Sequence, residues 1–225
     1  MTTKRKYDDG CAAAHALDLV GERWALLVVR ELMFGPKRFT DLRAGMPGAS
    51  PNVLTQRLRE LEEAGIVHRR KLPPPAAAWV YELTDWGQEL EPVVEALGRW
   101  GARSPVMQHD AAMSVDSLML ALKALFDPQR ARGTSAKLLL RLGEDSFRIE
   151  LSDDRIRIRR GVLNQPDAII ETDPDTLNAL LWSDESVATA IDEGAVRITG
   201  DRTWVKRFLG LFPLPEPAPA VRQPF

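Results

Sequence analysis

The chain has 225 residues, of which 44% are apolar and 28% charged, and its formal net charge is -2. This length and composition allow one large domain or two small ones with a buried core, and they exclude a largely disordered chain. The single cysteine, Cys11, excludes an intramolecular disulfide, and three isolated histidines offer no metal-ligand spacing, so no metal or other cofactor is expected. Because no run is apolar enough to span a bilayer and the first nine residues lack a signal-peptide pattern, we expect a soluble, cytoplasmic protein.

The first hundred residues predict helices followed by one hairpin. Ser50 is a good N-cap and Pro51 suits the first turn of a helix that Gly65 ends, while Thr84 caps a later helix that Pro92 should kink. The predicted elements are helices at 12–20, 23–34, 38–44 and 52–64, strands at 66–72 and 79–83, and a helix from 85 to about 102.

The helix at 52–64 has two unlike faces. Leu54, Leu58 and Leu61 fall on one side and predict a core contact. The opposite side carries a row of hydrogen-bonding groups, namely Asn52, Thr55, Gln56 and Arg59. Two short helices and a hairpin in this order predict a winged helix-turn-helix, in which the second helix enters the DNA major groove. The alternative is a polar helix face that is only solvated.

Charge is unevenly distributed along the chain. Residues 37–71 hold eight Lys and Arg against four Asp and Glu, a local +4, so the remainder sums to -6. Such a basic footprint favours DNA, with base contacts from the helix and phosphate contacts around it. The predicted DNA-binding residues are Lys37, Arg38, Ser50, Asn52, Thr55, Gln56, Arg57, Arg59, Arg69, Arg70 and Lys71.

A second region is predicted after a linker at 105–114. Strict alternation in the second and third of its strands predicts an antiparallel sheet with one wet face. The predicted elements are a helix from Ser114 to Phe126, strands at 136–142, 147–151, 155–160 and 168–172, helices at 174–182 and 185–193, a strand at 195–199 and a helix at 201–212. The fold class is therefore α+β, with an N-terminal domain at 1–104, a second domain at 115–212 and a proline-rich tail at 213–225.

Several separate motifs of the first region resemble, in order, the HxlR family of bacterial winged-helix transcription regulators, which is related to the MarR group. They are Cys11 with residues 15–21, Trp24, residues 30–32, 35–39, 54–62, 65–67 and 81–84, and Gly87. The resemblance implies a homodimer that binds a pseudo-palindromic operator. Independently, the helices at 12–34 and the apolar stripe from Trp86 to Trp100 carry more apolar surface than a small monomer hides.

Two departures from the family pattern bear on function. The hairpin loop reads Pro75 and then alanines at 76–78, whereas family wings often carry Pro-Pro-Arg, so the arginine for the minor groove is missing. Family members that sense oxidants use a cysteine at the position of Cys11, usually followed by proline, where this chain has Ala12. Cys11 is therefore a candidate redox sensor beside the alternative of a structural cysteine.

The second region resembles a sterol-carrier-protein type 2 domain, through Gly194, Ile198, Gly200 and Asp201 ahead of a last helix. That family encloses an apolar ligand between sheet and helices. Candidate lining residues are Ile149, Ile158, Trp182, Trp204, Phe208, Leu211 and Phe212, with a solid core as the alternative. The arginines at 148, 155, 157 and 159 form a face that suits an anion or a second DNA segment, or is only solvated.

No nucleophile, phosphate loop or carboxylate pair for an enzyme stands out. The leading hypothesis is a DNA-binding regulator whose second domain senses a hydrophobic small molecule. The alternative is a lipid carrier whose helix-turn-helix serves only dimerisation, and salt-dependent DNA binding distinguishes the two.

Overall fold

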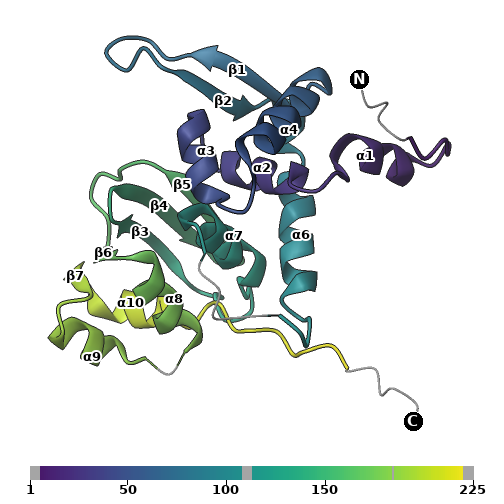
Figure 1. Cartoon of the computed structure of the whole chain (residues 1–225). Coiled ribbons are helices and arrows are strands. Elements are labelled where there is room, and N and C mark those ends of the chain that lie inside the picture. Colours follow the sequence, from purple (N-terminus) through teal and green to yellow (C-terminus); the bar gives the residue numbers. More distant parts are fainter. Residues whose placement is uncertain (1–5, 108–112, 184, 220–225) are drawn as a thin grey trace. The chain divides into compact units, whose positions relative to one another are not determined.

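The computed structural model describes residues 6–107, 113–183 and 185–219. The chain forms two compact units, Met1–Val94 and Glu95–Phe225, which are described separately (Figure 1). The division falls inside a helix, ahead of the predicted linker at 105–114. Residues 108–112 of that linker and 220–225 of the tail lie outside the described residues. Within the described residues, no helix is long and apolar enough to cross a membrane.

The first unit has the predicted series of helices and one hairpin. Its elements are α1 (Ala12–Val20), α2 (Ala25–Leu32), α3 (Phe39–Gly45), α4 (Pro51–Glu63), β1 (Val67–Lys71), β2 (Trp79–Leu83) and α5 (Asp85–Gln88), and it ends within α6 (Glu91–Gly101). The mixture of helices and sheet confirms the α+β class. Helix α2 begins two residues later than predicted because Trp24, at its N-cap, has a φ of 79°.

Helix α4 is held by its leucine face. Leu54, Leu58 and Leu61 are buried, and Ser50 caps the helix by accepting a hydrogen bond from the backbone N–H of Val53 at 3.4 Å. In the turn between α3 and α4, a Cβ on Gly48 would lie 2.9 Å from the Trp24 ring. A glycine therefore lets this turn approach the indole closely.

The predicted kinked helix at 85–102 is wrong, because the structure has two helices there. Helix α5 ends at Gln88, and Pro92 is the second residue of α6. A proline in the first turn breaks no helical hydrogen bond, so it is placed at a helix start and not at a kink. Thr84 caps α5, since its hydroxyl accepts from the backbone N–H of Gly87 at 3.0 Å and donates to the carbonyl of Gly65 at 2.7 Å.

The hairpin β1–β2 follows α4 after three residues and extends beyond the helices of its unit (Figure 1). The strands pair antiparallel, with Arg69 opposite Tyr81 and Lys71 opposite Trp79. Lys37 forms an isolated antiparallel β-bridge with Tyr81 through reciprocal backbone hydrogen bonds at 2.9 and 2.8 Å. The hairpin is therefore anchored to the segment between α2 and α3.

The second unit contains a five-stranded sheet in the order β5-β4-β3-β6-β7. Its elements are α7 (Val115–Leu125), β3 (Ser135–Leu142), β4 (Asp145–Ser152), β5 (Arg155–Arg160), β6 (Ala168–Thr172), α8 (Pro174–Trp182), α9 (Val187–Asp192), β7 (Arg197–Gly200) and α10 (Arg202–Leu209). The prediction of a wholly antiparallel sheet is wrong at one place, because β3 and β6 are parallel. The residues after β5 cross to the far side of the β3–β4 hairpin before β6 begins, which a local alternation pattern does not reveal.

One face of this sheet packs on helices, and alternate residues such as Leu138, Phe147 and Ile149 are buried there. Arg160 ties this face to α7, since its guanidinium bonds the buried carboxylate of Asp116 at 2.7 Å. The same guanidinium pairs with Asp145 and lies over the Phe147 ring, 4.6 Å from its centroid.

Candidate nucleic-acid interface and ligand pocket

The polar face of α4 is exposed as a continuous row. Asn52, Thr55, Gln56 and Arg59 are all exposed. Thr55 donates its hydroxyl to the carbonyl of Pro51 at 2.8 Å, and Gln56 donates to Glu60 at 3.0 Å. Asn52 and Arg59 have no side-chain partner among the described residues, and they lie two turns apart, about 10 Å along the helix. Both therefore project toward solvent with their hydrogen-bonding capacity unused.

Arg57 lies on the other side of α4, away from this row. Its side chain is 10% exposed and pairs with Glu60 at 2.6 Å and with Glu22 at 3.5 Å. Its guanidinium connects α4 to the turn between α1 and α2, so the structure gives it an internal position, although it is among the predicted DNA-binding residues.

Lys37 is also held inside the unit. Its ammonium donates to the fully buried carboxylate of Glu31 at 2.6 Å, and Arg30 donates to the same carboxylate at 2.9 Å. Arg38, the next residue, is exposed, and its backbone N–H donates to Asp41 at 3.2 Å. Of these two neighbours, Arg38 is the one whose side chain reaches solvent.

The hairpin carries cations on both faces, in different environments. Arg69 lies over the rings of Trp79 and Tyr81, 4.6 and 5.8 Å from their centroids, and Lys71 is exposed on the same face. On the other face, Arg70 donates to Glu82 at 2.7 Å. That hydrogen bond lowers the pKa of Glu82 and raises the pKa of Arg70.

The structure therefore sorts the eleven predicted residues into two groups. Those that are exposed and have no ion pair within the described part of the chain are Arg38, Ser50, Asn52, Thr55, Gln56, Arg59, Arg69 and Lys71. Lys37, Arg57 and Arg70 each neutralise a carboxylate of the same unit. Sequence reasoning missed Trp79, although strand alternation places it on the face of Arg69 and Lys71.

Cys11 is exposed at the N-cap of α1. The backbone N–H groups of Ala14 and Ala13 lower the pKa of its thiol by stabilising the thiolate. Asp9 accepts a hydrogen bond from the backbone N–H of Cys11 at 2.9 Å.

The predicted ligand-lining residues of the second unit pack against one another. Ile149, Ile158, Phe208, Leu211 and Phe212 are buried. The Phe208 and Phe212 rings are 5.0 Å apart at their centroids. The indole of Trp182 donates to the carbonyl of Phe212 at 2.9 Å, and Trp182 and Trp204 are half-buried. These contacts are those of a packed core.

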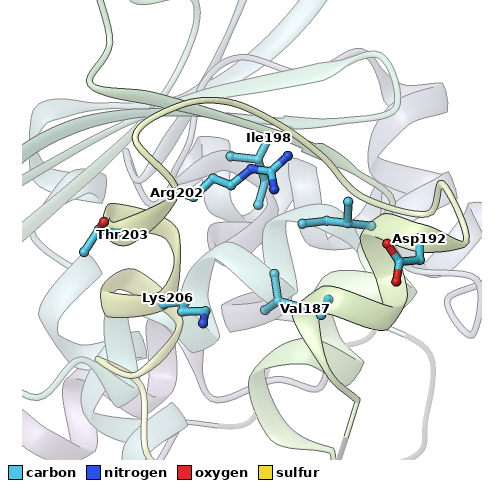
Figure 2. Close-up of a pocket in the computed structure, with 8 residues that line it drawn as sticks. Val187, Asp192, Ile198, Arg202, Thr203 and Lys206 are labelled. Carbon is cyan, nitrogen blue, oxygen red and sulfur yellow. The ribbon is translucent and has the colours of Figure 1, made fainter.

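A pocket of about 520 Å³ lies beside this core, between α9, β7 and α10 (Figure 2). None of the seven predicted lining residues borders it. Its walls combine apolar and charged side chains, namely Val187, Ala188, Ile191, Asp192, Ile198, Arg202, Thr203 and Lys206. Arg202 and Lys206 are exposed, one turn apart on α10, and neither has an ion pair among the described residues. The pocket therefore offers an apolar wall with two cations at one side.

A helix-turn-helix whose second helix exposes a polar row, followed by a hairpin, defines a winged helix-turn-helix protein. The chain belongs to the HxlR-like helix-turn-helix family, which matches residues 19–109, and, through residues 106–221, to the alkyl sulfatase C-terminal family. The resemblance of the second region to a sterol carrier thus stays a prediction.

Curated relatives match the first region. The uncharacterized HTH-type transcriptional regulator YvaP of Bacillus subtilis is 38% identical over 85 residues, which are 38% of this chain and 79% of that protein. The HTH-type transcriptional regulator YodB of the same organism is 39% identical over 85 residues, or 38% of this chain and 76% of YodB. The relative sll1512 of Synechocystis is 39% identical over 92 residues, which are 41% of this chain and 68% of that protein.

Solved structures resemble the same region. Reduced YodB from B. subtilis has a TM-score of 0.39 and 34% identity, over 44% of this chain and 97% of that one. The redox regulator HypR in its oxidized form has a TM-score of 0.39 and 35% identity, over 43% of this chain and 100% of that one.

Proposed function

We propose that this protein is a DNA-binding transcriptional regulator that reads a pseudo-palindromic operator as a homodimer. The observation that carries the proposal is the exposed row on α4, in which Asn52 and Arg59 have uncommitted hydrogen-bonding groups. Asparagine suits adenine and arginine suits guanine in the major groove. The relatives' names as transcriptional regulators support the same function.

The supporting phosphate contacts come from the cations that have no ion pair with any residue the structure describes. Arg38 is exposed at the N-cap of α3, and Arg69 and Lys71 are exposed on β1 after α4, so all three favour the DNA backbone. Trp79 and Tyr81 restrict the side chain of Arg69, so less conformational freedom is lost when it binds a phosphate.

The test is binding to the protein's own upstream DNA and to a random duplex, at several salt concentrations. Arg59→Ala should lose discrimination at one base position, costing about 1 to 3 kcal/mol there. Arg57→Ala is the matched control, because this arginine of the same helix faces inward. Absence of any retardation at low salt would refute the regulator and favour the lipid carrier. Equal losses on both duplexes for Arg59→Ala would remove its role as a base reader.

The homodimer is supported by apolar side chains that remain exposed on α5 and α6. Val93, Leu97 and Trp100 fall on one stripe of α6 and are 46%, 46% and 77% exposed, and Trp86 is 50% exposed. Leu97→Glu should shift the sedimentation coefficient toward the monomer. The same change at Val106, which is 84% exposed, is the control. A monomeric wild type would refute the dimer.

We also propose that the pocket between α9, β7 and α10 holds the hydrophobic effector. Ile191 and Ile198 supply apolar contact, while Arg202 and Lys206 favour an acidic group on the ligand. An apolar fluorescent sulfonate is a suitable probe, and Ala188→Trp, which fills the pocket, should abolish its signal. Glu193→Trp, an exposed position at the end of α9, should not. Equal signals from both variants would place the probe elsewhere.

A further inference from the structure

The face of the second unit's sheet that is opposite the helices is strongly basic. Strand pairing places Lys137 opposite Glu150, and Glu150 opposite Arg157, on this face. The pairing of β3 with β6 and of β6 with β7 places the remaining residues of this face. The cationic side chains of this face are Lys137, Arg141, Arg148, Arg155, Arg157, Arg159 and Arg197, and all of them are exposed.

Acidic side chains are scarce on the same face. The second unit has 17 Lys and Arg and 19 Asp and Glu, so its own net charge is -2. Seven of those cations but only Glu150 and Glu171 among the carboxylates occupy register positions on this face. Arg155 also pairs with Asp154 of the adjoining turn at 3.6 Å, where both side chains are largely exposed. Glu171 is already shared by Arg141 at 2.5 Å and Arg197 at 3.9 Å. The charge is therefore segregated, since a random distribution would leave the face close to neutral.

The strand register places two of the cations directly opposite each other. Arg148 of β4 lies directly opposite Arg159 of β5, and like charges at such positions destabilise a sheet. Neither has an ion pair among the described residues. Burial, together with the charge of Arg159, lowers the pKa of Lys123 on α7 to about 8. Folding alone does not favour this arrangement, so it points to an anionic partner.

We infer that this face, the basic sheet face, binds the phosphate backbone of duplex DNA as a contact surface separate from α4, an inference that rests on the proposed function. On the edge strand β5, Arg155, Arg157 and Arg159 recur every second residue, about 6.6 Å apart. That spacing is close to the distance between neighbouring phosphates of one DNA strand. Guanidinium groups bind phosphate oxygens in a bidentate manner, and six of the seven cations are arginines.

The composition of the face argues against other anionic partners. Leu139 and Ile169 are its apolar side chains, and no aromatic residue falls at its register positions. Peripheral membrane surfaces insert Trp, Phe or Leu beside their cations, and protein interfaces centre on aromatic anchors. A polar, arginine-rich face with few apolar groups is instead typical of a DNA interface.

The experiment measures the salt dependence of binding of the full chain to its upstream DNA and to a random duplex. Each lost phosphate contact should make the negative slope of log K against log salt shallower by about 0.9, so Arg155→Gln, Arg157→Gln and Arg159→Gln together should make it shallower by about 2.7. The preference for upstream over random DNA should stay unchanged. Arg103→Gln, Arg132→Gln and Arg207→Gln remove three exposed cations of the same unit that lie outside both this face and the pocket, and they serve as the matched control.

The outcomes separate this inference from the proposed function. The triple variant Arg155→Gln, Arg157→Gln and Arg159→Gln is called the β5 variant. A wild-type slope in the β5 variant, or a change equal to that of the control, would overturn the inference while leaving DNA binding by α4 intact. If wild-type protein binds no duplex, the proposed function itself fails. If the β5 variant loses binding to anionic vesicles but keeps its DNA slope, the face serves a membrane and the inference is wrong. The single variant Arg157→Gln, with an expected change of about 0.9, keeps the test decisive if the triple variant folds poorly.

Discussion

The ammonium of Lys37 lies 2.6 Å from the carboxylate of Glu31, a side chain that is fully buried. A Cβ on Gly45 would lie 2.1 Å from that carboxylate, so α3 is closely packed around it. The backbone of Lys37 also pairs with Tyr81. This one ion pair therefore links α2, α3 and the hairpin.

Replacing Lys37 with methionine should reduce stability more than DNA affinity. Breaking a buried ion pair costs about 3 to 5 kcal/mol, and Arg30 remains beside Glu31, so we expect the lower end of that range. Denaturant unfolding measures the change, with Arg38→Met as the exposed neighbouring control. A folded, equally stable variant whose DNA binding became less salt-dependent would make Lys37 a phosphate contact after all.

The two neighbouring cations Arg70 and Lys71 should respond differently to substitution. Lys71→Ala should reduce the magnitude of the salt slope of DNA binding by about 0.9, the value for one phosphate contact. Arg70→Ala should lower it less, because Glu82 already neutralises that guanidinium. Titrations at several salt concentrations compare them directly, and a larger effect for Arg70 would contradict this assignment.

Gly87→Ala should destabilise the first unit. An added Cβ would lie 2.1 Å from the carbonyl oxygen of Ile66, which is backbone and cannot rotate away. Overpacking of this kind costs about 1 to 3 kcal/mol. Gly101→Ala, where a Cβ has open space, is the control in thermal unfolding. Equal melting temperatures for the two variants would show that the α5 contact adjusts freely.

The thiol of Cys11 should ionise at a lower pH than in the unfolded chain. The amides of Ala14 and Ala13 stabilise its thiolate, so the folded-state pKa lies below the ordinary value. The rate of alkylation against pH should have its midpoint below that measured in urea. Equal midpoints in the folded and the urea-unfolded protein would show that the start of α1 does not lower the pKa of the thiol. If alkylated protein keeps its full DNA affinity, Cys11 is structural and not a sensor.

Local patterns were sufficient to predict much of the fold. Helices α1 and α8 and strands β2, β5 and β6 have the predicted bounds, because Asp173 caps α8 and strict alternation marks β5. The start of α2 was missed, since the left-handed backbone of Trp24 has no local signature. The parallel pairing of β3 with β6 joins residues about 30 apart and depends on which edge of the hairpin is free.

The sequence was sufficient to predict which side chains of the candidate sites are exposed, but not which of them form ion pairs. Helical periodicity correctly turned Asn52 and Arg59 outward. It could not reveal that Glu22 pairs with Arg57, because an ion pair between residues that are distant in sequence forms only after the chain has folded. The pair of Arg57 with Glu60, three residues along the same helix, is one that helical spacing allows. An aromatic stripe such as Phe208 and Phe212 fits both a cavity wall and a core, and the structure packs these two rings together.

The position of β3 at the centre of its sheet also affects the order of folding. Strand β4 follows β3 after a short turn and pairs with it as a hairpin, whereas β6 closes a much longer loop onto the other edge of β3. Local hairpins form in about 1 to 10 μs, while distant parallel pairing is slow because loop closure must come first. We therefore expect the β3–β4–β5 meander to form early, with its β3 edge unpaired until β6 arrives. During synthesis that edge is the part of the second unit most open to pairing with another chain.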